Sequence, residues 1–170
     1  AGMLDPGYLG LRAKEISLTE SLGIAAPGMP TVGADLGPAP APDGTAHGLS
    51  TTHVSVIDAD GNAVSMTTSI ETVFGSRLMV HGFLLNSQMT DFSMLPNKDG
   101  APVINRIAAG KRPLSSMAPT LVLDGQGRIV MAVGSPGGSR IIVYVAKTIV
   151  AVLDWKLNIQ EAINLANFSN

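Results

Sequence analysis

The residues of this chain whose types could do chemistry begin with two consecutive threonines, Thr51 and Thr52, after a stretch rich in proline and glycine. A threonine hydroxyl is a poor nucleophile unless a base lies beside it. If the peptide bond before Thr51 is cut, the α-amine of Thr51 supplies that base, because an α-amine has a pKa of about 7.7–8.0 and exchanges a proton near ambient pH. The same two residues also fit the start of an ordinary β-strand, and from local sequence alone that plainer interpretation is the more common one.

A second candidate is the glycine-rich segment at residues 134–140, which contains Gly137 and Gly138 just before a long apolar run. Glycine has no Cβ, so its backbone N–H can approach a substrate closely, and at a helix N-terminus it faces developing negative charge. The pattern suits an oxyanion hole, but by itself it is more common in a tight strand-to-helix turn. It is not a P-loop, which needs Gly-Lys-Ser/Thr, and Pro136 occupies the serine position of the hydrolase elbow.

Two pairs of polar residues complete the set of candidates. Ser115 and Ser116 are adjacent hydroxyls in a predicted loop and suit a carboxylate, whereas Gln88 and Asp91 follow a predicted strand and suit an ammonium group. Loop solvation and a solvated strand end are the ordinary alternatives for these pairs. The three histidines show no spacing typical of metal ligands, so we expect neither a metal ion nor a cofactor.

The composition limits the classes of function. The chain has 170 residues, of which 45% are hydrophobic and 14% are charged, which is apolar for a small domain. One explanation is that much of the chain is buried, and a further segment is one candidate for covering it. The net charge of -2 and the few aromatic residues argue against a nucleic-acid partner. The apolar run at residues 141–153 is too short to span a bilayer, so no membrane partner is expected. The absence of cysteine excludes a cysteine nucleophile.

These candidates need elements that position them. Asp5 and Pro6 predict the start of a helix of about three turns, and residues 27–50 predict an irregular, exposed linker. Strands are predicted at residues 52–57, 63–68, 83–86, 120–123 and 128–133, with a long loop at 94–113. A buried helix is predicted at residues 141–155, and Asn158 with Glu161 predicts a capping box for a final helix. Strands followed by packed helices are typical of layered α+β folds.

Taken in order, these segments resemble the γ-glutamyltranspeptidases, a family of N-terminal-nucleophile hydrolases. The matching segments are residues 51–58, 60–65, 74–75, 84–93, 111–117 and 134–140. Each motif alone is weak, but the ordered set is specific and covers most of residues 51–170. The resemblance implies an α+β fold, an αββα sandwich that is incomplete in this fragment. It makes residues 1–50 the C-terminal end of a large subunit and residues 51–170 the N-terminal part of a small, catalytic subunit.

The family is made as one chain that cuts itself before a threonine, and the match places the cut between Ser50 and Thr51. The resemblance implies that Thr51 then takes the γ-glutamyl group from glutathione or a related γ-glutamyl amide, and that water or an amine releases it from the acyl-enzyme. By the same resemblance Gly137 and Gly138 form the oxyanion hole. Ser69 stands where the family commonly has a threonine that contacts the amine of the nucleophile.

The resemblance also assigns the groups that bind the substrate. Ser115 and Ser116 would hold the α-carboxylate, and Gln88 and Asp91 would hold the α-ammonium. Glu71 departs from the best-known members, which carry an asparagine there; a carboxylate can bind an ammonium strongly but can also change the preference of the pocket. Asp91 favours an amino-bearing acyl group over a plain dicarboxylic one.

The family's substrate-clamping arginine and the last strands of its small subunit lie outside this chain. The resemblance therefore implies two partners, the rest of the large subunit and the C-terminal part of the small subunit, and no turnover by this fragment while the bond between Ser50 and Thr51 is intact. Two alternatives remain open at this point. One is a cephalosporin- or glutaryl-type acylase on the same fold, and the other is an unprocessed, non-catalytic homologue.

Overall fold

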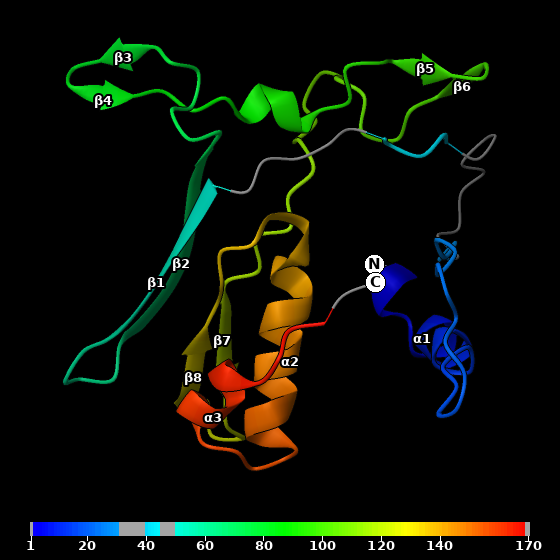
Figure 1. Ribbon diagram of the computed structural model, residues 1–170. Coiled ribbons are helices and arrows are strands. Elements are labelled where there is room, and N and C mark those ends of the chain that lie inside the picture. The colour runs from blue at the N-terminus through cyan, green and yellow to red at the C-terminus, as the bar shows by residue number, and fades with distance from the viewer. Residues whose placement is uncertain (1, 31–39, 45–49, 169–170) are drawn as a thin grey trace. The chain divides into compact units, whose positions relative to one another are not determined.

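A computed structural model describes residues 2–30, 40–44 and 50–168 (Figure 1). It forms two compact units, residues 1–39 together with residue 170, and residues 40–169. The first unit contains the 3-10 helix η1 (Gly2–Leu4) and the helix α1 (Pro6–Ala13). The side chain of Asp5 accepts a hydrogen bond from the backbone N–H of Tyr8 at 2.8 Å, which confirms the predicted helix start. The helix is shorter than predicted because none of its residues is buried, and short helices depend on packing for stability.

The second unit contains the remaining elements, in chain order β1 (Ser50–Ile57), β2 (Ala63–Glu71), β3 (Met79–Val80), β4 (Phe83–Leu84), η2 (Gln88–Asp91), β5 (Asn97–Lys98), β6 (Ala101–Pro102), β7 (Thr120–Leu123), β8 (Ile129–Val133), η3 (Gly138–Arg140), α2 (Ile141–Leu153) and α3 (Ile159–Asn164). The strands pair as four antiparallel hairpins, β1 with β2, β3 with β4, β5 with β6, and β7 with β8. The two long predicted hairpins are thereby confirmed. The predicted loop at residues 94–113 contains the small hairpin β5–β6.

The described part of the predicted linker in this unit is not fully exposed. Ala41 is only 9% exposed and forms a parallel bridge with Val103. Its N–H donates to the carbonyl of Pro102 at 3.0 Å, and its carbonyl accepts from the N–H of Ile104 at 3.0 Å. Ala41 can pair because it keeps the N–H that its two proline neighbours lack. Residues 31–39 and 45–49 of the predicted linker lie outside the described residues.

The hairpin β1–β2 has one apolar and one polar face, because side chains alternate along a strand. Val54, Val56, Val64 and Met66 are between 41% and 54% exposed. Val54 and Val56 share a face, as the sequence predicted. The hydroxyls of Ser55 and Ser65 on the opposite face donate to backbone carbonyls of β8. Within the described residues the polar face is therefore the one that contacts the second long hairpin.

The core lies between that hairpin and α2. Buried residues from both elements form one cluster, which comprises Met131, Val133, Ile141 and Val145. The prediction that α2 is apolar and buried on nearly all sides is wrong for its outer face, where Ile142 is 55% exposed. The predicted capping box of α3 is confirmed by hydrogen bonds in both directions between Asn158 and Glu161. No described helix has the length and apolarity needed to cross a membrane.

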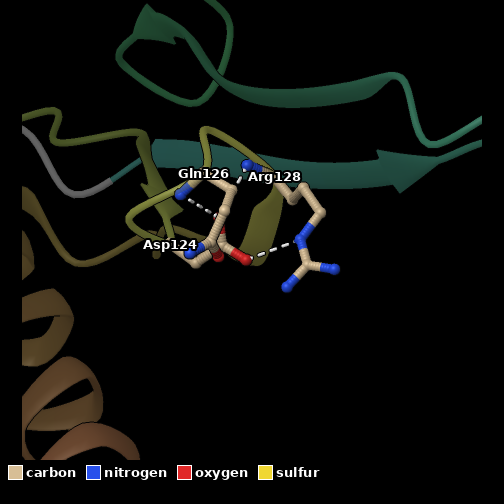
Figure 2. Close-up of polar contacts among 3 residues, drawn as sticks. All are labelled: Asp124, Gln126 and Arg128. Atoms are coloured by element: carbon tan, nitrogen blue, oxygen red, sulfur yellow. Dashed lines mark hydrogen bonds and ion pairs between the residues drawn. The ribbon is translucent and has the colours of Figure 1, made fainter.

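The turn between β7 and β8 is closed by Asp124 (Figure 2). Its carboxylate accepts from the backbone N–H groups of Gln126 at 2.9 Å and Arg128 at 3.0 Å, and from Nε of Arg128 at 2.7 Å. These hydrogen bonds, of which the one from the backbone of Arg128 is the largest cause, lower the pKa of Asp124 below its ordinary value of 3.8. The charged carboxylate is therefore the form that stabilises this turn.

We expect Asp124→Asn to lower the melting temperature slightly at pH 7. The folded state lowers the pKa of Asp124, so its contribution is complete above the unfolded value and is lost as the pH falls through the folded pKa. The difference from the wild type should accordingly shrink in strong acid, as followed by thermal unfolding across pH. Asp99→Asn, in the turn of β5–β6, controls for the loss of one charge. A deficit that does not change with pH would contradict the prediction.

Candidate active site

The structure brings most of the predicted site residues into one pocket. All of them except Ser50 and Gly137 line it, namely Thr51, Ser69, Glu71, Gln88, Asp91, Ser115, Ser116 and Gly138. They come from β1, β2, η2, the loop before β7, and η3. Leu114, Met117, Ser139 and Ile141 complete the lining. Residues separated by up to 90 positions in the chain thus line one pocket. Local sequence patterns alone could not predict that they lie close together.

Thr51 enters this pocket at an irregularity in the hairpin. Ser50 pairs with Glu71, and Thr52 pairs with Thr68. The strand β2 therefore has one residue more than β1 in this interval, so Ser69 and Ile70 together lie opposite Thr51. Such a bulge re-aims side chains and is common beside active sites. Three residues at this bulge, Thr51, Ser69 and Glu71, line the same pocket.

The hydroxyl of Ser69 contacts the peptide bond that precedes Thr51. It donates a hydrogen bond to the carbonyl oxygen of Ser50 at 2.5 Å and accepts one from the N–H of Glu71 at 2.9 Å. A hydroxyl has a single hydrogen to donate, and the N–H of Glu71 leaves that hydrogen directed at the carbonyl. Ser50 does not line the pocket, but its carbonyl is polarised by a residue that does.

The two glycines of the predicted oxyanion hole have different surroundings. Gly137 has φ of 142° and Gly138 has φ of 58°, conformations that side chains rarely adopt. A Cβ on Gly137 would lie 2.8 Å from Cε2 of Tyr144, so this glycine is required by its close contact with α2. Gly138 lines the pocket and begins η3, the short helix that directly precedes α2. Sequence analysis assigned both glycines to the oxyanion hole, whereas only Gly138 lines the pocket.

The acidic side of the pocket is rich in hydrogen-bond acceptors. Asp91 is 7% exposed and Glu71 is 8% exposed, and Nε2 of Gln88 donates to Oδ2 of Asp91 at 3.0 Å. The other amide atom, Oε1 of Gln88, is buried and accepts no hydrogen bond from the described residues. Buried acceptors are usually satisfied, so this oxygen suits a ligand that brings a donor. An ammonium group, with three N–H donors, has that chemistry.

The other side carries the two serines. Ser115 is exposed and Ser116 is half-buried, and the apolar residues on either side of them, Leu114 and Met117, are 47% and 37% exposed. The side chain of Ser115 accepts from the N–H of Met117 at 3.3 Å. Both serines line the pocket, so their hydroxyls are available to a ligand there.

Asn105 is a structural residue of the site that sequence analysis missed. It is 8% exposed, and its Nδ2 donates to the backbone carbonyl of Asp91 at 2.6 Å and to Oδ2 of Asp43 at 2.7 Å. Its Oδ1 accepts from the N–H of Leu114 at 3.2 Å. Asn105 thereby connects the end of η2 to the loop of Ser115. One asparagine in a predicted loop gives no local signal of such a role.

Metal ligation has no support in the part of the chain that the structure describes, where no three His, Cys, Asp or Glu residues are grouped to hold an ion. His53 instead contacts two hydroxyls, with Nδ1 2.9 Å from Oγ1 of Thr67 and Nε2 3.0 Å from Oγ of Ser55.

Comparison with known proteins places the chain among relatives of one kind. A sequence model of the family described as gamma-glutamyltranspeptidase matches residues 1–170. The glutathione hydrolase proenzyme of Pseudomonas sp. (strain A14) is 44% identical over 128 residues, which are 71% of this chain and 22% of that protein. The glutathione hydrolase proenzyme of Pseudomonas aeruginosa is 38% identical over 170 residues, covering 96% of this chain and 28% of that protein.

A solved structure agrees with the sequence comparisons. The crystal structure of a mutant of Helicobacter pylori gamma-glutamyltranspeptidase is 47% identical and superposes with a TM-score of 0.60, covering 69% of this chain and 67% of that chain. The predicted N-terminal-nucleophile hydrolase fold, present in part, is therefore confirmed. This chain spans between a fifth and three tenths of the length of the curated relatives it matches. Because the family model matches the chain over its whole length, the chain belongs to the gamma-glutamyltranspeptidase family.

Proposed function

We propose that this chain is the central part of an enzyme that hydrolyses and transfers γ-glutamyl groups through an acyl-enzyme on Thr51. The observation that carries the proposal is the single pocket that combines Thr51, Gly138, an acceptor-rich wall and two serine hydroxyls. The names of the relatives, glutathione hydrolase proenzymes, support both the class of donor and a precursor that is cut.

Maturation would begin at the bond between Ser50 and Thr51. The Thr51 hydroxyl attacks the Ser50 carbonyl carbon, the C–N bond breaks, and the hydroxyl proton passes to the Thr51 nitrogen. Water then hydrolyses the resulting ester, which leaves a carboxylate on Ser50 and a free amine on Thr51. The hydrogen bond from Ser69 to the Ser50 carbonyl supports this step, because it would stabilise the oxyanion that forms there.

The mature site would use Thr51 for acyl transfer. The amine of Thr51 takes the hydroxyl proton while the hydroxyl oxygen attacks the γ-carbonyl of the donor, and the proton then passes to the leaving amine. The backbone N–H groups at the turn of Gly138 would face the developing oxyanion at the start of α2. Water or an acceptor amine releases the γ-glutamyl group from the ester.

The walls of the pocket would hold the two ends of the glutamyl group. Ser115 and Ser116 offer hydroxyl donors to the α-carboxylate, while Gln88, Asp91 and Glu71 offer acceptors to the α-ammonium. The buried Oε1 of Gln88 favours a ligand that carries an N–H donor at this place. A glutaryl group has no ammonium and would leave that oxygen unsatisfied, which favours a γ-glutamyl donor over a glutaryl one.

The complete enzyme would contain more polypeptide than this chain. We propose that residues 1–50 end the large subunit, that residues 51–170 begin the small subunit, and that both come from one precursor as a heterodimer. The exposed apolar face of β1–β2, which includes Val54 and Val64, supports such a partner, because a contiguous apolar surface favours burial.

The full-length parent protein tests this proposal directly. Mass spectrometry should find a chain that begins at Thr51, and the processed protein should hydrolyse a γ-glutamyl anilide faster than the corresponding glutaryl anilide. A parent that never exposes the amine of Thr51 would indicate a non-catalytic homologue. Faster hydrolysis of the glutaryl compound would indicate an acylase of the other type.

We expect Ser69→Ala to slow the cleavage before Thr51 by about tenfold or more, since loss of one oxyanion donor typically costs 10²–10³ in rate. The uncut precursor would be followed on denaturing gels against time. Ser69→Thr keeps the hydroxyl and is the matched control, with a rate near the wild type. Cleavage of Ser69→Ala at the wild-type rate would show that this hydrogen bond does not assist maturation.

A further inference from the structure

His53 lies on β1 two residues after Thr51, and side chains two apart on a strand point to the same face. Its ring takes part in a chain of hydrogen bonds that crosses from one hairpin to the other. The hydroxyl of Ser55 donates to the carbonyl of Ala132 on β8 at 3.3 Å, so toward Nε2 of His53 it acts as the acceptor. In the neutral ring Nε2 therefore carries the proton, and Nδ1 accepts from Thr67.

The ring also rests against the backbone at the end of β8. A Cβ built on Gly134 would lie 2.1 Å from Cε1, 2.3 Å from Nδ1 and 2.7 Å from Nε2 of His53. Gly134 directly follows β8 and begins the loop that leads to Gly138. The imidazole thus fills the space between the strand that carries Thr51 and the first residue of the glycine-rich loop.

This contact matters because the two long hairpins are separate sheets. In the described part of the chain no backbone ladder joins β1–β2 to β7–β8. Side-chain hydrogen bonds connect them instead, from Ser55 to the Ala132 carbonyl and from Ser65 to the Val133 carbonyl at 3.0 Å. The separation of Thr51 from Gly138 therefore depends on what is packed between the hairpins, and the His53 ring is packed there.

We propose that His53 is a positioning residue for the acyl-transfer reaction. Its ring packs against Gly134 and thereby sets the distance between Thr51 and the Gly138 turn. The inference rests on the proposed function. A misplacement of about 1 Å can cost a factor on the order of 10² in rate. Four of the five residues that would bind the glutamyl ends come from η2 and the loop of Ser115, and only Glu71 lies on β2. A shift between the hairpins should therefore affect the chemical step more than donor binding.

The test uses the processed full-length protein, with γ-glutamyl anilide as donor and rates expressed per titrated active site. We expect His53→Ala to lower kcat by about 10- to 100-fold and to change KM by less than about threefold. His53→Gln, which keeps a donor for Ser55, should recover part of kcat. Gly134→Ala should be impaired because its methyl meets the ring.

The double variant His53→Ala with Gly134→Ala is the decisive one, because the new methyl group enters the space that the ring has left. It should have a kcat at least about threefold above His53→Ala alone, a non-additivity expected of residues in contact. Circular dichroism and melting temperature check that each variant is folded. If His53→Ala does not fold, the double variant and His53→Gln carry the test.

Three outcomes would overturn the inference. They are an unchanged kcat in folded His53→Ala, a loss that appears in KM instead of kcat, and a double variant no better than either single one. An inactive wild-type parent would overturn the proposed function and this inference with it. An active wild type with any of the three outcomes would overturn the inference alone.

Discussion

Replacing Thr51 by alanine should leave the full-length parent as one uncut chain without γ-glutamyl transfer activity. The substitution removes the only hydroxyl that the proposed mechanism uses, both for cutting the bond after Ser50 and for accepting the acyl group. Loss of a catalytic nucleophile in a comparable hydrolase costs on the order of 10⁶ in kcat, so activity should fall to the background. Mass spectrometry and anilide hydrolysis measure the two effects separately.

Two neighbouring variants make this result specific. Thr52→Ala changes the adjacent residue, which is exposed and does not line the pocket, and it should be cut and active. Thr51→Ser keeps the hydroxyl and should still be cut, at a reduced rate. Normal processing of Thr51→Ala into two chains would show that another residue is the nucleophile.

The elements that were predicted well from the sequence are those held by interactions between residues close together in the chain. The hairpin β1–β2 begins its turn at Asp58, whose side chain accepts from the N–H groups of Asp60 at 3.0 Å and Asn62 at 2.8 Å. The capping box of Asn158 and Glu161 is equally local. Such interactions are present in the sequence pattern itself, because both partners lie within four residues of each other.

The features that sequence could not supply depend on distant partners. Asn105 is recognisable only after the chain has brought Asp91 and Leu114 to it. The bulge opposite Thr51 results from pairing that shifts by one residue, and no turn residue marks it. The polar side chains of β1 and β2 face the second hairpin because the hydroxyls of Ser55 and Ser65 donate to backbone carbonyls of β8. This arrangement is the reverse of the usual one, in which the apolar face of a hairpin is the covered face.

Gly138→Val should abolish acylation while leaving the protein folded. Valine at this position places a branched side chain at the wall of the pocket that also contains Thr51, where the proposed oxyanion must fit against backbone N–H groups. Valine keeps the backbone N–H, but its side chain would hold the oxyanion away from these donors. Losing the contact with one such donor costs about 10²–10³ in kcat. The burst of aniline released in the first turnover should disappear, because that burst measures acylation.

A backbone effect must be separated from this effect in the pocket. Gly138 has φ of 58°, and valine with such a φ is strained at any position in a protein. Gly110→Val supplies the matched control. Gly110 has φ of 71°, a Cβ there meets nothing within 4 Å, and it is not part of the pocket lining. Both variants should lose similar stability in thermal unfolding, but only Gly138→Val should lose the burst. A normal burst in folded Gly138→Val would remove this turn from the mechanism, and equal losses in both variants would assign the effect to backbone strain.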